Sequence, residues 1–260
     1  MKALSLFEYP VKGLRGNALA CASVNKRGLA TDRRWMLVDD VGNFLSQRQL
    51  PALTQFISVY ENHLIIKHLP SAEERTIDSS AFTELLAVTV WGQQCAAHGA
   101  IHDISQWLSN LLKSKVNLVY MQEHDVRPIK SSKANDMVSF ADGYPVLLTT
   151  SSSLAELNGR LSEPIKMDRF RANIIIDGDL AYAEDTWQRI KIGEVTFSVA
   201  KLCARCHVIN IDQESGLATK EPLKTLSTYR QDGNRVNFGI NLIPENTGII
   251  HQHDEVVVLA

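Results

Sequence analysis

The residues best suited to chemistry gather in one short segment, residues 201–207, which reads Lys-Leu-Cys-Ala-Arg-Cys-His. It holds two of the four cysteines of the chain, Cys203 and Cys206, with Arg205 between them. A fixed cation beside a cysteine favours the thiolate over the thiol. A thiolate is a nucleophile or a ligand for a soft metal, so the segment predicts one of these two roles.

Four interpretations of the cysteine pair compete. Structural zinc usually takes four cysteine or histidine ligands, and a second cysteine pair is missing, although His207 or another histidine would add a ligand. A redox-active pair belongs at the start of a helix, whereas Val208 and Ile209 predict a strand. Two buried structural thiols would not need Arg205 and Lys201 beside them. The fourth interpretation accounts for both the cysteines and the cations. In it, one thiolate binds a soft, high-valent metal, and the cations neutralise an anionic cofactor.

An anionic cofactor would need further cations at turns or strand ends, and three positions supply them. Lys12 and Gly13 lie in a turn-prone stretch. Arg33 directly precedes an expected strand, and Arg171 enters another. Taken singly, each cation would also suit a surface salt bridge. Asn173, in an otherwise apolar strand, needs a hydrogen-bonding partner. Together these groups suit a ligand with a phosphate and a heteroaromatic edge.

The composition limits the class of protein. The 260 residues are 45% hydrophobic, which is enough for a sizeable core in one large domain or two small ones. The 27 basic residues nearly balance 29 acidic ones, so bulk charge indicates neither nucleic acid nor a membrane as partner. No apolar run reaches the roughly 18–20 residues that cross a bilayer, and no signal peptide is evident. We expect a soluble cytoplasmic protein in which Cys21 and Cys95 are packed core thiols.

The first ninety or so residues have the composition of short strands. Strands are expected at residues 34–39, 44–46, 56–60 and 63–68, with turns at 40–43 and 61–62. A helix is expected at about 103–113, with Asp103 as its N-cap and an apolar face, and this helix would bridge the two halves of the chain.

The second half combines strands with short helices. One helix would start at Ser153, where Ser153 and Glu156 form a capping box, and another would follow Pro222. Strands are expected at 172–176, at 189–192 and 195–199 as a hairpin, at 207–212 and at 255–259. The expected class is mostly β with some α. A β-barrel-like N-terminal domain would cover 1–118, and a second β-barrel domain with peripheral helices 119–260.

Five motifs occur in an order that resembles a known family. They are Tyr-Pro-Val-Lys-Gly at 9–13, Asp-Arg-Arg-Trp at 32–35, Phe-Arg-Ala-Asn-Ile at 170–174, Cys-Ala-Arg-Cys at 203–206 and Lys-Glu-Pro-Leu-Lys-Thr-Leu-Ser-Thr-Tyr-Arg at 220–230. The ordered set resembles the MOSC superfamily. Within that superfamily it resembles proteins of the amidoxime-reducing type, in which an N-terminal MOSC β-barrel domain precedes a MOSC domain. The resemblance covers nearly the whole chain.

The resemblance implies a molybdenum cofactor, Mo-molybdopterin, that sits between the two domains and takes one cysteine thiolate as its protein ligand. The matching motif puts this metal ligand, which is also the catalytic residue, at Cys206. The further cofactor contacts that the resemblance implies are Ala204, Arg205, Lys12, Gly13, Arg33, Arg171, Asn173, Asp142 and Thr150.

The implied activity is the reduction of small N-hydroxylated compounds by oxygen-atom transfer at the molybdenum. Electrons would come from a separate ferredoxin-type or flavoprotein-type donor, because the four cysteines do not have iron–sulfur spacing. The alternatives are a non-catalytic module that carries or inserts the cofactor or sulfur, and a zinc-stabilised β domain. Pyridoxal phosphate binding is a further association of the family. Gly13 stands where the amidoxime-reducing enzymes have serine, and His207 departs from the residue expected after the ligand.

Overall fold

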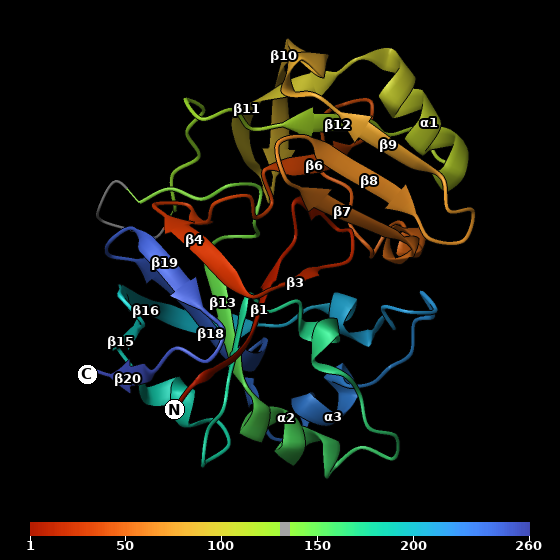
Figure 1. Cartoon of the computed structure of the whole chain (residues 1–260). Helices are drawn as coiled ribbons and strands as arrows, with labels where there is room; N and C mark the ends of the chain where they lie inside the picture. Colours follow the sequence, from red (N-terminus) through yellow and green to blue (C-terminus); the bar gives the residue numbers. More distant parts are fainter. Residues whose placement is uncertain (131–135) are drawn as a thin grey trace.

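The structure is a computed structural model that describes residues 1–130 and 136–260, and the strands within these residues form four sheets. The largest sheet lies in the lower half of Figure 1. Its strands follow the spatial order β20 (Val256–Val258), β15 (Arg189–Ile192), β16 (Val195–Ala204), β18 (Arg235–Pro244), β13 (Val146–Thr150), β14 (Ile174–Ile176), β1 (Ala3–Glu8) and β3 (Asn17–Leu19), and β17 (Gln231–Asp232) pairs with β18. Strands β13 and β14 are parallel, and the pairs on either side of them are antiparallel.

The other three sheets are smaller. One has the order β10 (Phe82–Val90), β11 (Gln93–Ala100), β12 (Asn117–Tyr120), β6 (Trp35–Val38) and β2 (Val11–Lys12). A second has the order β7 (Phe56–Tyr60), β8 (Leu64–His68) and β9 (Glu74–Ile77), and a third β19 (Gly248–His251), β4 (Cys21–Asn25) and β5 (Gly28–Leu29). The expected class, mostly β with some α, is confirmed. Among the described strands, however, no sheet closes into a barrel, and the sheets are open.

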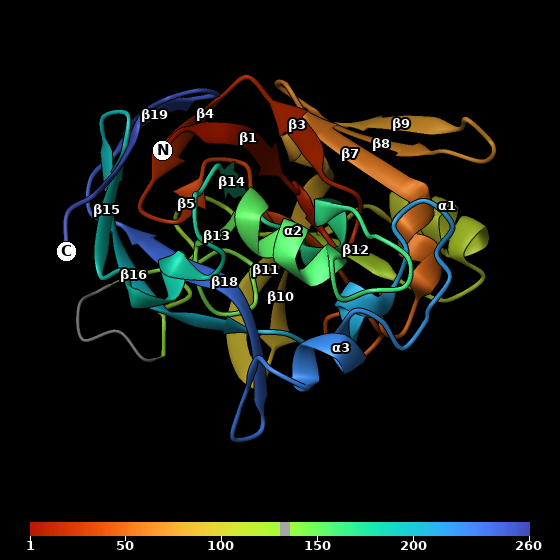
Figure 2. The same ribbon diagram turned by 90° about the horizontal axis from the view of Figure 1, so that it is seen from below.

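The elements are arranged in two lobes (Figure 1). The upper lobe holds the five-stranded sheet, β7–β9 and the helix α1 (His102–Leu112). The lower lobe holds both chain ends, the large sheet and the helices α2 (Ser151–Asn158) and α3 (Leu223–Ser227), which lie on its outer face when the molecule is seen from below (Figure 2). Short 3₁₀ helices are η1 (Pro51–Gln55), η2 (Ser79–Ala81), η3 (Met167–Phe170), η4 (Ala183–Thr186) and η5 (His207–Asn210).

Each lobe has its own buried apolar core, and the start of the chain belongs to the core of the lower lobe. Leu6 and Val24 are buried in one cluster with residues of the second half such as Ile174 and Phe197. A separate cluster of residues between Val11 and Tyr120 forms the core of the upper lobe. Burial of these side chains is the main favourable contribution to folding. The predicted domain boundary between residues 118 and 119 stays a prediction. The first 29 residues contact residues of the second half of the chain in the lower core and also pair with β6 of the first half.

The strands expected at 34–39, 56–60 and 63–68 and the hairpin at 189–199 are confirmed as β6, β7, β8 and the β15–β16 pair. The helix expected at 103–113 is α1, but its N-cap is Ile101 rather than Asp103, which lies in the first turn. The prediction that α1 bridges the two halves is wrong. Trp107, Leu108 and Leu112 pack only in the cluster of the upper lobe.

The expected capping box of the second helix is also wrong. Helix α2 starts two residues earlier, and Thr150 is its N-cap, with its hydroxyl accepting a hydrogen bond from the amide of Ser153. Ser153 therefore lies within the first turn. Glu156 instead accepts hydrogen bonds from the hydroxyls of Tyr182 and Tyr229. The helix expected after Pro222 is confirmed as α3.

Two further predictions fail, the first of them because tertiary contacts override local preference. The strand expected at 207–212 is the 3₁₀ helix η5, in which Ile209 enters an apolar cluster and the Asn210 side chain accepts a hydrogen bond from the amide of Leu223. Cys21, expected in the core, is exposed on β4, whereas Cys95 is half-buried on β11.

In the described part of the chain no helix has the length and apolarity that a membrane-spanning helix needs.

The buried carboxyl group of Glu184, next to α2, predicts a pH dependence of stability. Ser153 Oγ donates to this carboxyl at 2.8 Å, and burial raises the pKa of Glu184 above its ordinary value of 4.5. The folded state then binds the proton more tightly than the unfolded chain does. The free energy of unfolding should therefore fall as pH rises from about 4.5 through the raised folded pKa.

Glu184→Gln should remove this fall, so the variant should gain stability relative to the wild type between about pH 4 and about pH 8 in urea unfolding. Glu163→Gln, which changes an exposed carboxylate, is the control and should leave the pH profile unchanged. Identical profiles for Glu184→Gln and the wild type would contradict this assignment.

Candidate functional site

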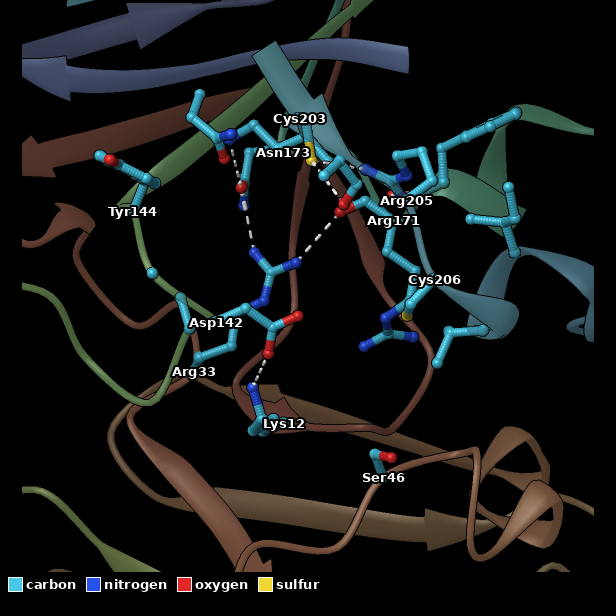
Figure 3. A pocket seen from close by; sticks show the side chains of 18 of the residues that line it. Lys12, Arg33, Ser46, Asp142, Tyr144, Arg171, Asn173, Cys203, Arg205 and Cys206 are labelled. Carbon is cyan, nitrogen blue, oxygen red and sulfur yellow. Dashed lines mark hydrogen bonds and ion pairs between the residues drawn. The ribbon is translucent and has the colours of Figure 1, made fainter. Parts of the chain in front are cut away.

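A cavity of about 150 Å³ lies where the two lobes meet (Figure 3). It brings together nine of the ten residues predicted as site residues: Lys12, Gly13, Arg33, Asp142, Arg171, Asn173, Ala204, Arg205 and Cys206. These residues come from segments that lie far apart in the sequence. Ends of strands supply several of them, because Lys12 ends β2 and Ala204 ends β16.

The segment with the two cysteines reaches the cavity through an irregular strand end. The register between β16 and β18 shifts between Leu202 and Ala204, an irregularity of the β-bulge type close to the end of β16. The amide of Arg205 then donates to the carbonyl of Val236 at 2.7 Å, and Cys206 is the N-cap of η5. The bulge thus directs residues 203–206 into the cavity.

A buried carboxylate, that of Asp32, organises the wall behind the cavity. Its Oδ1 accepts hydrogen bonds from the amide of Tyr9 at 2.9 Å and from Asn173 Nδ2 at 3.0 Å, and Arg33 Nη1 forms an ion pair with its Oδ2. Burial raises the pKa of Asp32, while the Arg33 guanidinium and these hydrogen bonds oppose the rise. One carboxylate therefore connects three segments of the chain.

Asn173 finds its hydrogen-bonding partners within the protein. Its Oδ1 accepts from Arg33 Nη1 at 3.0 Å and from the amide of Leu147 at 3.1 Å, and its Nδ2 also donates to the carbonyl of Phe7 at 3.2 Å. The amide thus positions Arg33, and its own hydrogen-bonding capacity is filled.

Arg33 and Arg171 share an uncommon backbone conformation and one aromatic ring. Their φ angles are 50° and 55°, in the left-handed region that residues other than glycine seldom adopt. Their guanidinium carbons lie 4.2 and 4.4 Å from the centre of the Tyr9 ring. Burial raises the pKa of Tyr9 to about 12 and lowers that of Arg171 to about 10, so both cations face a neutral ring at pH 7.

Lys12 and Asp142 form an ion pair on the opposite wall (Figure 3). Trp91 Nε1 donates to the same carboxylate at 3.0 Å. Desolvation opposes ionisation of Asp142, but Lys12 and Trp91 together lower its pKa well below the usual range. Burial lowers the pKa of Lys12, and Asp142 opposes that shift.

The two cysteines have different surroundings. Arg205 Nη1 donates to the sulfur of Cys203 at 3.0 Å, and Arg205 Nη2 donates to the carbonyl of Phe170 at 2.6 Å. The sulfur of Cys206 has no hydrogen-bonding partner within the described residues. The arginine between the cysteines therefore contacts the first thiol rather than the predicted metal ligand.

The donor groups of the cavity fit an anionic cofactor with a soft metal. Four cations line it, Lys12, Arg33, Arg171 and Arg205, against one carboxylate, that of Asp142. Lys12 and Arg33 are ion-paired. Within residues 1–130 and 136–260, Arg171 and Arg205 have no acidic partner, and Arg205 Nε is buried without any hydrogen bond. An unsatisfied buried donor, excess positive charge and a free thiol are the groups that such a ligand would satisfy.

Some predicted residues lie elsewhere, and some lining residues were missed. Thr150 does not line the cavity, because its hydroxyl caps α2. Lys201 lies 4.9 Å from the Tyr144 ring, outside the cavity lining, and His207 is exposed. Ser46 and Gln47, which were not predicted, line the cavity from the upper lobe and belong to no motif that the sequence shows.

Asn173 and Asn241 both line the cavity, but their substitution should lower the free energy of unfolding by different amounts. Asn173→Leu would leave the partners of four hydrogen bonds unsatisfied in the interior and should lower the free energy of unfolding by roughly 3 kcal/mol. Asn241→Leu is the matched control. It removes one bond, to the carbonyl of Leu202 at 3.3 Å, and should cost about 1 kcal/mol. Equal losses in urea unfolding would refute the central position of Asn173.

Comparison with known proteins assigns both halves of the chain to domain families. The model of the MOSC N-terminal beta barrel domain matches residues 1–115, and that of the MOSC domain matches residues 135–257. The mitochondrial amidoxime-reducing component 1 of Mus musculus is 31% identical over 98% of this chain and 81% of its own length. Its counterpart in Homo sapiens is 30% identical over 98% of this chain and 82% of its own length.

A third relative has a different name. The molybdenum cofactor sulfurase of Oryza sativa subsp. japonica is 29% identical over 92% of this chain but only 32% of its own length. The two domain matches and the 31% identity over nearly the whole chain are mutually consistent. The chain therefore belongs to the family of MOSC proteins that includes the mitochondrial amidoxime-reducing components.

Proposed function

We propose that this chain binds a molybdenum cofactor in the cavity between its lobes and reduces small N-hydroxylated compounds. The observation that carries the proposal is one thiol without a hydrogen-bonding partner, Cys206, in a cavity whose cations exceed its carboxylates. The names of the relatives, amidoxime-reducing components and a molybdenum cofactor sulfurase, support the cofactor and the reaction class.

Each cavity residue has a role in this proposal. Cys206 would be the metal ligand. Arg171 and the free Nε of Arg205 would bind the anionic part of the cofactor, since both lack an acidic partner among the described residues. The ion pair between Lys12 and Asp142 would fix the lysine side chain so that its charge lies at the cavity. When bound, the cofactor would supply the metal centre for oxygen-atom transfer.

Gly13 would let the backbone approach the cofactor. Its φ of +94° lies in the left-handed region, and a Cβ there would lie 3.1 Å from Leu53 Cδ1. A serine at this position would strain the backbone of this turn. Asn173 and Arg33 would act as positioning residues, since their side chains are hydrogen-bonded within the protein. We leave Thr150 out of this site.

The proposal includes a separate electron donor of the ferredoxin or flavoprotein type. The four cysteines, at 21, 95, 203 and 206, do not have the spacing of iron–sulfur ligands. We do not extend the proposal to pyridoxal phosphate. Lys12, the lysine in the cavity lining, is held in an ion pair with Asp142 and is poorly placed for a Schiff base.

A second candidate function is a carrier of the cofactor or of sulfur. The observation in its favour is a second thiol in the same cavity, Cys203, which a cation contacts at 3.0 Å. Such a protein would carry a persulfide on a cavity cysteine and would not reduce benzamidoxime with a supplied donor system. The two functions therefore differ in a direct assay.

The ligand assignment predicts different effects for the two cysteines. Cys206→Ser should lower the molybdenum content by at least about tenfold after production in a host that makes the cofactor, because a hydroxyl is a poor ligand for a soft metal. Cys203→Ser is the matched control and should keep most of the molybdenum. Elemental analysis of the purified proteins measures both. Full molybdenum in both variants, or loss only in Cys203→Ser, would refute Cys206 as the ligand.

A further inference from the structure

A cluster of two histidines and one aspartate lies outside the cavity, where β11 and β12 end. His98 is on β11, and His124 and Asp125 are in the turn that follows β12. His98 Nε2 lies 3.5 Å from Asp125 Oδ2, and His124 Nε2 lies 3.7 Å from Asp125 Oδ1. One ligand atom from each of the three side chains falls within 4.8 Å of the others.

The donor set matches that of a zinc site. Imidazole nitrogen and carboxylate oxygen bind Zn²⁺ at about 2.0–2.2 Å in a tetrahedral arrangement, which places neighbouring ligand atoms about 3.3 Å apart. The two His–Asp distances, 3.5 Å to Oδ2 and 3.7 Å to Oδ1, exceed this by a few tenths of an ångström, and one ligand atom of each side chain lies within 4.8 Å of the others. Side-chain rotations that bring both histidines toward the carboxylate would therefore close the site.

The hydrogen bonding of the cluster points to the same ligand. The Nε2 atom of His98 is buried and has no hydrogen-bonding partner, although it faces the carboxylate of Asp125. A buried polar atom without a partner is unfavourable, and a metal ion would satisfy it. Asp125 itself is oriented, because its Oδ2 accepts a hydrogen bond from the amide of Gln122 at 2.7 Å. An oriented carboxylate of this kind is typical of metal ligands.

The turn that carries two of the three groups is firmly held. Arg27, from the lower lobe, donates to the backbone carbonyls of Gln122, Glu123 and Asp125. The Arg27 charge opposes cation binding, but it is directed at carbonyl oxygens rather than at the carboxylate. The His124 side chain is 73% exposed, which leaves a route for a metal ion and room for water as a fourth ligand.

We infer that His98, His124 and Asp125 bind a divalent transition metal, zinc in the first place, at a site separate from the cavity. The metal would join β11 to the turn at the boundary between the lobes. The chain continues from this turn to Arg127, whose guanidinium donates to the carbonyls of Ala141 and Asp142. The site would thus stabilise the segment that positions the carboxylate partner of Lys12.

A zinc titration of the chelator-treated protein against a chromophoric competitor tests this inference. The wild type should bind one zinc ion at this site, and His124→Ala and Asp125→Asn should each weaken that binding by at least about tenfold. Because the His124 side chain is exposed, His124→Ala should fold as the wild type does. His102→Ala is the matched control, because His102 also lies near a carboxylate, 3.9 Å from Asp103, but has no third ligand among the described residues.

Cobalt substitution separates this site from the cavity thiols. Cobalt bound by His98, His124 and Asp125 should give visible bands without the near-ultraviolet absorption of a sulfur ligand, and Cys206→Ser should keep the same spectrum. Zinc binding that survives both His124→Ala and Asp125→Asn, or that disappears in Cys206→Ser, would overturn the inference. An absence of zinc binding in the wild type would show that the cluster forms only histidine–aspartate ion pairs and would overturn it equally.

Discussion

The buried carboxylate of Asp32 is the interaction on which the arrangement of the cavity depends. It accepts hydrogen bonds from the backbone of Tyr9 and the side chain of Asn173 and pairs with the Arg33 guanidinium. A buried ion pair of this kind adds little net stability, but the loss of one partner is costly. Because the three partners come from three segments, the same carboxylate fixes both the contact between these segments and the position of a cavity cation.

The cations of the cavity fall into two groups as a result. Lys12 and Arg33 have acidic partners and hold the walls in place. Arg171 and Arg205 have none among the described residues, and Arg171 is held by its left-handed backbone and the Tyr9 ring. Strained backbone at a residue that faces a cavity is common where the side chain must point at a ligand. The positive charge is thus fixed in advance, which suits the binding of an anion that fills the space between the lobes.

The sequence predicted the residues of the cavity better than their roles. Ordered motifs led to Arg33, Arg171 and Cys206 because the set resembles a known family, although each cation taken singly would also suit a surface salt bridge. The roles of Asn173 and Arg205 could not be predicted, since their partners are set by contacts between distant segments. The strand expected at 207–212 failed for the same reason: β-branched residues favour a strand, but burial of the side chains decided the conformation.

We propose that the cavity between the lobes binds a molybdenum cofactor. The most direct test is the metal and pterin content of the wild-type protein, purified from a host that makes the cofactor. We expect molybdenum and pterin in amounts equimolar with the chain, both released on denaturation. Protein that contains neither molybdenum nor pterin under these conditions would contradict it, whatever its zinc content.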